Sequence, residues 1–302
     1  MATIDEPVRA RASTQESGHS RDLERPPLPD PLRVPVVDTH CHLDINDGDD
    51  AGSWLGVDEA LARAATVGVT RIVQVGCDLA SARWSVQAAS AHPHIVATVA
   101  LHPNEAPRIA ASEGLAALEA AYREIAELAA LPQVRAVGET GLDHFRTGDD
   151  GRVVQEESFR RHISIAKSLG KPVVIHDRDA HDDVIRVLES EGPPDVVVFH
   201  CYSGDVEMAR YCADRGWYLS FAGTVTFKNA KSLREAVAVV PLERILVETD
   251  APFLTPMPFR GRPNASYLVP HTVRVLAEAA AVDEDLMAQA LWDNAQRVFG
   301  PW

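Results

Sequence analysis

The sequence lacks any long hydrophobic run and any patterned set of cysteines. Its longest apolar stretches, such as the one from Val196 to Phe199, have the length of a strand, whereas a helix needs roughly 20 apolar residues to cross a bilayer. A chain that spans a membrane is therefore excluded. The four cysteines form no CxxC pair, which argues against a disulfide framework or a structural zinc site. We expect a protein of the reducing cytoplasm.

Positive charge is scarce as well. The 302 residues include 29 Lys and Arg against 44 Asp and Glu, which gives a formal net charge of -15. Such a protein cannot grip long duplex nucleic acid through counterion release alone. A polyanionic substrate would have to be held locally, by metal ions or by a few placed arginines.

Two parts of the chain differ in composition. Residues 1–33 are rich in Arg, Asp, Glu, Ser and Pro and contain no apolar run of the length that a secretory signal requires, so we expect a disordered N-terminal extension. Residues 34–302 alternate short Val- and Ile-rich runs with longer amphipathic stretches, which is typical of βα units. The strand candidates lie at 34–38, 71–75, 95–101, 134–138, 172–176, 196–200, 217–221 and 245–249.

These eight repeats predict the α/β class and a (β/α)8 TIM barrel, which typically takes about 250 residues. A doubly wound open sheet is the alternative, and it would need a glycine-rich phosphate-binding fingerprint after the first strand. No such fingerprint follows 34–38. We therefore predict one barrel domain over 34–302, preceded by the extension.

Side chains that bind metals lie at the predicted C-terminal ends of the strands, where a TIM barrel carries its active site. His40 and His42 are two residues apart, so a strand presents both to the same side. A second pair of this spacing, His92 and His94, precedes the third strand, and we expect it to be structural. The set at the barrel mouth is His40, His42, Glu139, His176, His200 and Asp250.

Burying four imidazoles and two carboxylates at one place without a cation would leave costly unpaired polar groups. The set therefore predicts two divalent metal ions, with Mg, Mn or Zn as candidates. A site of this kind activates water at neutral pH and stabilises an oxyanion. It implies hydrolysis of an ester, an amide or a phosphodiester.

The motifs that carry these residues, in this order, resemble the TatD family of metal-dependent deoxyribonucleases within the amidohydrolase superfamily. The resemblance extends over 36–300. The motifs are VDTHCHLD (37–44), LHP (101–103), VGETGLD (137–143), VIHDRDA (174–180), HCYSG (200–204), ETDAPFL (248–254) and RGRPN (260–264).

The resemblance implies a role for each predicted ligand. His40 and His42 would hold the first ion together with Asp250, and His176 and His200 would hold the second. Glu139 resembles the carboxylate that bridges the two ions. Asp250 also resembles the aspartate that accepts the proton of the attacking water, so Asp250 and Glu139 are the predicted catalytic residues.

Substrate contacts are predicted in the loops beyond the strands. His102, Arg178, Tyr202 and Arg260 are the candidates, with Arg and Lys holding phosphate and an aromatic ring stacking on a base. Lys228, Arg262 and Phe253 are weaker candidates of the same kinds. We expect the acidic stretch 44–50 to be a solvated loop.

Three classes of function follow. The first is a nuclease that trims single-stranded DNA or RNA ends from the 3′ side, with no membrane and no obligate protein partner. The second keeps the metal site for a small-molecule ester or amide, or for D-aminoacyl-tRNA, because one barrel supports many chemistries. The third is a non-catalytic scaffold, which we disfavour because its signature would be a broken ligand set.

Overall fold

The computed structural model describes residues 4–13, 21–48 and 53–301. Eight parallel strands form one sheet in the order β10-β9-β8-β7-β6-β5-β4-β2. The sheet closes where Cys41 bridges to Ala251 and where the Asp250 N–H donates to the His40 carbonyl. The strands are β2 (Val36–Cys41), β4 (Val69–Gly76), β5 (Ile95–Val99), β6 (Val134–Asp143), β7 (Val173–Arg178), β8 (Val197–Phe199), β9 (Tyr218–Phe221) and β10 (Ile245–Val247). The predicted TIM barrel and its eight strands are confirmed.

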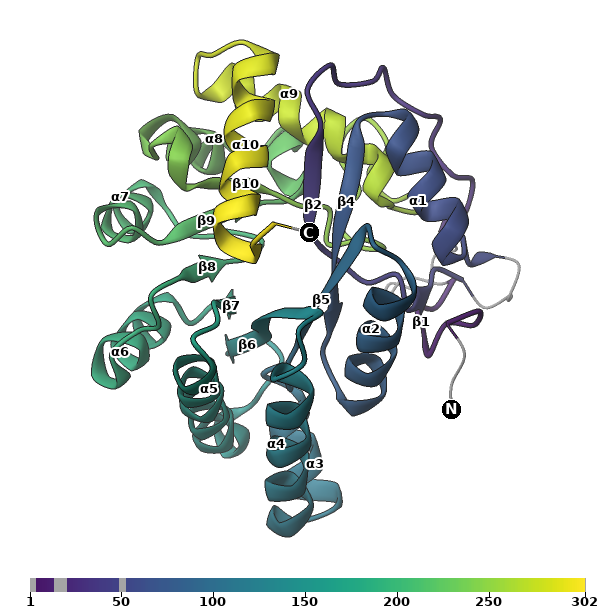
Figure 1. Cartoon of the computed structure of the whole chain (residues 1–302). Coiled ribbons are helices and arrows are strands. Elements are labelled where there is room, and N and C mark those ends of the chain that lie inside the picture. Colours follow the sequence, from purple (N-terminus) through teal and green to yellow (C-terminus); the bar gives the residue numbers. More distant parts are fainter. Residues whose placement is uncertain (1–3, 14–20, 49–52, 302) are drawn as a thin grey trace.

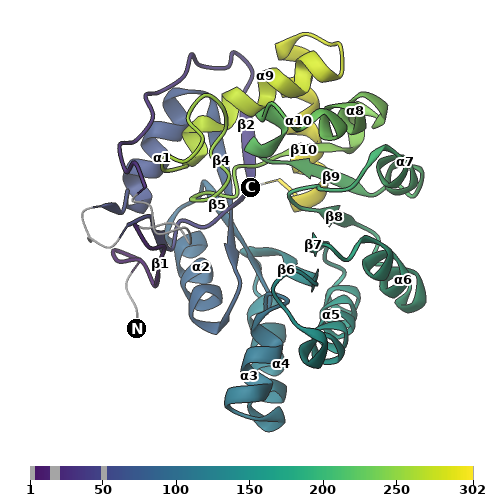
Figure 2. The same ribbon diagram turned by 180° about the vertical axis from the view of Figure 1, so that it is seen from behind.

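Helices surround this barrel on the outside (Figures 1 and 2). They are α1 (Val57–Thr66), α2 (Leu79–Ala91), α3 (Glu105–Ser112), α4 (Leu115–Ala129), α5 (Asp149–Leu169), α6 (His181–Glu191), α7 (Val206–Asp214), α8 (Lys231–Val239), α9 (Val269–Ala279) and α10 (Glu284–Phe299). Asp78, Asp205 and Asp283 cap the N-termini of α2, α7 and α10 by accepting backbone N–H bonds. Within the described ranges, no helix is long and apolar enough to cross a membrane.

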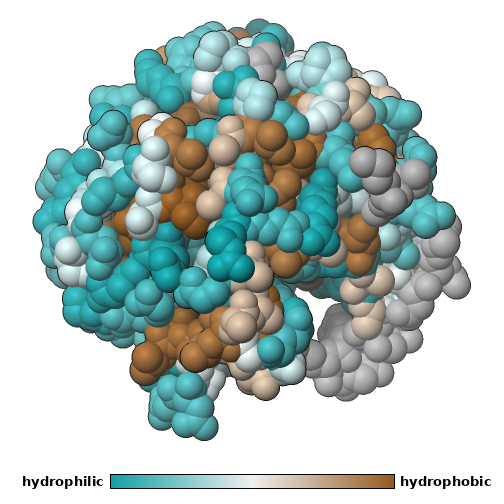
Figure 3. All heavy atoms as spheres, turned by 60° about the horizontal axis from the view of Figure 1, so that its bottom comes forward, coloured by the Kyte–Doolittle hydropathy of each residue, from teal (hydrophilic) through white to brown (hydrophobic). Residues whose placement is uncertain are grey.

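The helices bury their apolar faces against the barrel. The molecular face in Figure 3 is mostly hydrophilic, and its apolar residues are divided among several separate patches. Each of the eight strands contributes one apolar side chain to a single buried cluster: Val37, Val73, Val96, Ala136, Val174, Val198, Tyr218 and Leu246. Helix α10 adds Ala295, Val298 and Phe299 to this cluster and so closes the end of the barrel opposite the C-terminal ends of the strands. The other end, where the strands terminate, is left for polar side chains.

The N-terminal extension requires a correction. We expected disorder over 1–33, but its described residues, 4–13 and 21–33, lie against the barrel. Strand β1 (Arg9–Ala10) pairs in parallel with β3 (Ile45–Asn46). The Trp84 indole donates to the Glu6 carbonyl, and the Tyr267 hydroxyl donates to the Pro26 carbonyl. The composition predicted disorder because the segment has no apolar core of its own. Strand pairing and charged contacts hold it to the barrel instead.

The acidic stretch after β2 is also different from the expectation of a solvated loop. Asp44 and Asp47 are both buried, with 0% and 3% of their side chains exposed. Each carboxylate is paired with an arginine of the N-terminal segment, Asp44 with Arg9 and Asp47 with Arg21. Asp49 and Asp50 lie outside the described residues. The stretch is therefore the anchoring surface for the N-terminal segment.

His162 on α5 gives the fold a dependence on pH. Its Nε2 accepts the Leu101 N–H at 3.0 Å, and its Nδ1 lies 2.7 Å from the Ser158 carbonyl. Burial lowers its pKa to about 4. Because an unfolded histidine has a pKa of about 6.5, the stabilisation is complete above that pH and is lost as the pH falls toward 4.

We expect the metal-free protein to lose on the order of 2 kcal/mol of unfolding free energy through His162 alone between about pH 7.5 and pH 5. Urea unfolding in EDTA at both pH values, with His162→Gln beside the parent protein, measures this difference. The substitution should flatten the pH dependence. An equal loss of stability in both proteins would contradict the assignment.

Candidate metal centre

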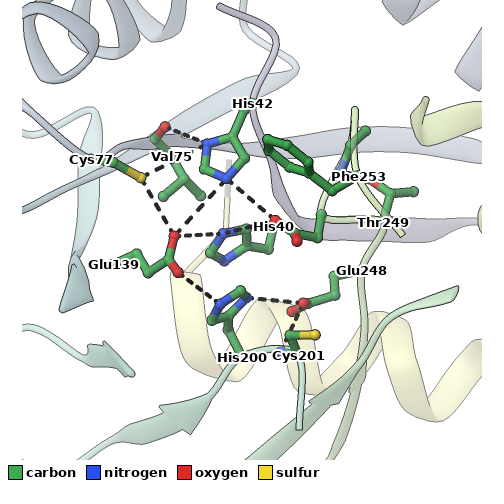
Figure 4. Close-up of polar contacts among 12 residues, drawn as sticks. His40, His42, Val75, Cys77, Glu139, His200, Cys201, Glu248, Thr249 and Phe253 are labelled. Carbon is green, nitrogen blue, oxygen red and sulfur yellow. Dashed lines mark hydrogen bonds and ion pairs between the residues drawn. The ribbon is translucent and has the colours of Figure 1, made fainter. Parts of the chain in front are cut away.

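The six predicted metal ligands converge at the C-terminal end of the barrel, with the carboxylate of Glu139 on β6 at their centre. Figure 4 shows this carboxylate with three of the ligands, His40, His42 and His200. One oxygen, Oε1, lies 2.6 Å from His176 Nδ1 and 2.9 Å from His200 Nε2. The other, Oε2, lies 3.4 Å from His40 Nε2 and 4.0 Å from His42 Nε2. The two oxygens thus face two pairs of imidazoles, which suits a carboxylate that bridges two cations.

Asp250 completes the half of the centre formed by β2. Its Oδ1 lies 3.4 Å from His42 Nε2 and 3.9 Å from His40 Nε2. Asp250 has a left-handed φ of +53°, a conformation that aspartate tolerates better than most residues. The neighbouring Thr249 is fixed by Asp38, whose buried carboxylate accepts bonds from both its N–H and its hydroxyl. Burial raises the pKa of Asp38 to about 6, against the lowering effect of these bonds.

His40 provides the observation that tests whether the cluster suits a metal. Its side chain is 0% exposed, and in the part of the chain that the structure describes neither of its ring nitrogens has a hydrogen-bond partner. Such a group is costly to bury unless something binds it. Its ring stacks on that of His200 with centroids 3.9 Å apart, an arrangement unfavourable for two protonated imidazoles. A divalent cation facing Nε2 satisfies both requirements, so the residues fit the predicted group.

The remaining ligands are oriented by partners on their far side. His42 Nδ1 lies 3.1 Å from the Val75 carbonyl, and His200 Nδ1 lies 3.1 Å from Glu248. His176 Nε2 lies 3.3 Å from Asp143. For His42 and His200 the acceptor fixes one nitrogen and leaves the other facing Glu139 or Asp250, as carbonyls and carboxylates do behind metal-binding histidines. Among the described residues, His176 Nε2 has no hydrogen-bond partner and is near Asp143 only as an ion pair.

Charge coupling within the cluster shifts the titration of its members. Burial raises the pKa of Glu139, but the surrounding imidazoles, His200 first among them, hold it well below its usual range. Burial lowers the pKa of His200, and the carboxylates of Glu139 and Glu248 more than reverse this, so that it is raised well above its usual value. Burial and the charge of His200 lower the pKa of His40. Without a metal the centre therefore holds a proton, which cation binding would displace.

A cavity of about 670 Å³ opens above the cluster. Among its lining residues, Arg178 places its guanidinium 4.0 Å from the ring centroid of Phe145, whose side chain is 60% exposed. His102 also lines the cavity. Its Nδ1 accepts the Asn104 N–H, so the ring proton is on Nε2, which lies 3.6 Å from Glu139. His102 is thus arranged as a hydrogen-bond donor toward the cavity.

Two predicted substrate contacts lie away from this cavity. Tyr202 is 3% exposed, donates its hydroxyl to the Asp205 carbonyl and packs edge-on against Phe221. Its ring has no open face for a base. Arg260 stacks over Phe227 instead of pointing to the cluster. Of the weaker candidates, Phe253 lines the cavity, whereas Arg262 is ion-paired with residues of the N-terminal segment.

Several residues of the centre escaped prediction from the sequence. Glu248, Asp143 and Cys77 contact ligands, with the Cys77 thiol donating to Glu139 at 3.4 Å. Glu248 and Asp143 occur in motifs that were recognised, so their acidic character at strand ends was the available signal. Phe145 and Arg9 gave no signal, because neither lies in a recognised motif.

A parallel barrel with histidines and carboxylates gathered at its C-terminal mouth defines the class of the protein, the TIM-barrel metal-dependent hydrolases. Comparison with known proteins gives the family. The family model of the TatD related DNases matches residues 37–300. The chain therefore belongs to this family.

Individual relatives agree with this assignment. The uncharacterized metal-dependent hydrolase TatD of Mycobacterium tuberculosis is 47% identical over 269 residues, which cover 88% of this chain and 98% of that protein. The uncharacterized metal-dependent hydrolase YabD of Bacillus subtilis is 37% identical, over 87% of this chain and 98% of that protein. The crystal structure of YjjV, a TatD homologue of Escherichia coli, superimposes with a TM-score of 0.77 at 28% identity, covering 88% and 98% of the two chains.

Proposed function

We propose that the protein is a deoxyribonuclease that removes nucleotides from single-stranded 3′ ends by hydrolysing phosphodiester bonds. The observation that carries the proposal is the cavity directly above the Glu139 cluster. Its volume of about 670 Å³ lies in the range of sites for single small ligands, which suits one terminal nucleotide. Its lining includes Arg178 and Arg146 together with six acidic residues, so these arginines and the bound cations would supply the positive charge that a phosphate needs.

The residues divide the reaction between them. The imidazoles of His40, His42, His176 and His200 and the two carboxylates would hold two divalent cations, which would supply Lewis acidity and lower the pKa of water. The Asp250 carboxylate is the group that accepts the proton of the attacking water. Burial raises the pKa of Asp250, but the hydrogen bond from His42 and the nearby imidazoles lower it overall, so the carboxylate is ionised at neutral pH.

Substrate binding relies on Arg178 and His102, which line the cavity, and on the Phe145 ring next to Arg178. Arg178 offers a planar guanidinium that can pair with phosphate oxygens through two bonds. His102, whose pKa is lowered to about 3 by burial against the opposing charge of Glu139, stays neutral and donates from Nε2 to a phosphate or leaving-group oxygen. The exposed ring of Phe145 beside Arg178 gives the base a stacking surface.

Digestion of a 5′-end-labelled single-stranded oligonucleotide by Mn²⁺- or Mg²⁺-loaded protein tests the proposal. We expect stepwise shortening from the 3′ end that EDTA abolishes. Arg178→Ala should raise KM on the oligonucleotide by about tenfold or more, because a charge-assisted bond to phosphate contributes roughly 1.5–3 kcal/mol. Arg186→Ala is the matched control, since this exposed arginine on α6 pairs with Glu156 away from the cavity.

The same protein preparation should be tested on carboxylic esters, amides and D-aminoacyl-tRNA. Hydrolysis of one of these by metal-replete protein, with none of the oligonucleotide, would overturn the nuclease proposal and leave the metal centre intact. Cleavage that persists in EDTA would overturn the role of the cations.

A further inference from the structure

The N-terminal segment reaches the metal centre through Arg9. The Arg9 guanidinium donates two bonds to the carboxylate of Asp44, from Nε at 2.6 Å and from Nη2 at 3.0 Å. Asp44 is fully buried and lies two residues beyond His42. The same Nη2 is 3.3 Å from the His42 ring. A bidentate pair of this kind fixes orientation as well as charge, so Arg9 sets the position of the loop that carries His42.

Arg11 makes the corresponding contact on the other side of the first ion's ligands. Its guanidinium donates to the Pro252 carbonyl at 2.6 Å and lies over the Phe253 ring, 4.9 Å from the centroid. Both residues belong to the loop that follows Asp250. The two arginines, two positions apart, therefore hold the two loops that provide His42 and Asp250.

The segment is anchored independently of these two contacts. The pairing of β1 with β3 fixes the backbone at Arg9, opposite Ile45. Arg21 is buried and donates to both oxygens of Asp47, with Nη2 at 2.9 Å from Oδ2. Each anchor joins the segment to the stretch directly after His42. The match to the family model begins only at residue 37, so both arginines lie in a part of the chain that this match leaves out.

We propose that the N-terminal segment is a working part of the metal centre, in which Arg9 and Arg11 are positioning residues for His42 and Asp250. The inference rests on the metal ligands of the proposed function and is independent of the substrate. Among the residues that the structure describes, removing Arg9 leaves the buried Asp44 carboxylate with the Gln74 amide as its only side-chain hydrogen-bond donor. An uncompensated buried carboxylate draws water or moves its loop, and His42 moves with it.

Metal binding, measured apart from activity, tests the proposal. Titration calorimetry with Mn²⁺ on the full-length metal-free chain should give an affinity about 10 to 100 times lower for Arg9→Ala, the range found when a partner behind a metal ligand is removed. Arg11→Ala should weaken binding in the same direction. Arg33→Ala is the matched control, because within the described ranges this arginine of the same segment forms only an exposed ion pair with Asp285.

A second readout separates positioning from simple stabilisation. Absorption spectra of the Co²⁺-loaded proteins report the ligand geometry, and we expect a changed spectrum for Arg9→Ala and an unchanged one for Arg33→Ala. Arg9→Lys, which keeps the positive charge but loses the two parallel bonds, should recover affinity only in part. If Arg9→Ala does not fold, the double variant Arg9→Ala/Asp44→Asn removes the buried charge, and its lowered Mn²⁺ affinity supports the proposal equally.

The outcomes distinguish this inference from the proposed function. One outcome is that the parent protein binds Mn²⁺ while Arg9→Ala and Arg11→Ala keep its affinity and its Co²⁺ spectrum. That result would overturn the positioning role and leave the metal centre in place. Parent protein that binds no Mn²⁺ would overturn the metal centre itself.

Discussion

Asp250→Asn is expected to lower kcat by at least about a thousandfold, since a general base alone contributes roughly 10²- to 10⁴-fold and this residue is also a predicted metal ligand. The amide has nearly the same shape as the carboxylate but cannot accept the proton of water. The backbone contact of Asp250 with the His40 carbonyl does not involve the side chain, so the barrel should still close. Steady-state hydrolysis of the oligonucleotide by metal-replete protein measures the effect.

Two controls accompany this variant. Circular dichroism and thermal unfolding in EDTA should match the parent protein, which would show that the loss is chemical. Asp293→Asn, on helix α10 far from the cluster, should retain full activity, because among the described residues its side chain accepts only from Gln289. Residual activity near the parent level in Asp250→Asn would mean either that another group accepts the proton or that a contaminating nuclease is being measured.

The barrel was predictable from the sequence because its signals are local. Each strand is a short apolar run buried on both faces, and each helix is amphipathic, so eight repeats could be identified without any tertiary information. The N-terminal segment was not predictable in this way. Its attachment depends on Arg9 and Asp44, which are 35 positions apart, and on a strand of two residues. A charged pair of that separation leaves no periodicity in the sequence.

The ligands of the centre were predictable for a related reason. Parallel strands bring their C-terminal ends to one mouth, so a histidine or carboxylate at a strand end is placed by topology alone. The side chains beyond the strand ends are placed by loop conformation instead. Tyr202 turns inward to donate to the Asp205 carbonyl, whereas Phe145 is 60% exposed beside Arg178. Nothing in the order of residue types distinguishes these two aromatic rings.

Glu139→Gln is expected to abolish binding of the two proposed ions and with it the proposed activity. The carboxylate lies within 4.0 Å of five imidazoles, and its two oxygens face different pairs of the four that belong to predicted ligands. A neutral amide has only one acceptor atom and no charge, so it cannot bridge two cations. Metal analysis after dialysis should find less than about one ion per chain, with activity reduced by at least about a thousandfold.

In its metal-free form, Glu139→Gln should also differ from the parent protein in the pKa of His200. Glu139 is the first cause that raises the pKa of His200 after the opposing effect of burial, so the substitution should lower that pKa, as NMR titration of the ring protons can measure. Glu156→Gln is the matched control, because Glu156 on α5 pairs only with Arg160 and Arg186 on the surface. If Glu139→Gln retained two ions, another group would have to bridge them. His40 and Asp250 would then be among the ligands that still hold the first ion.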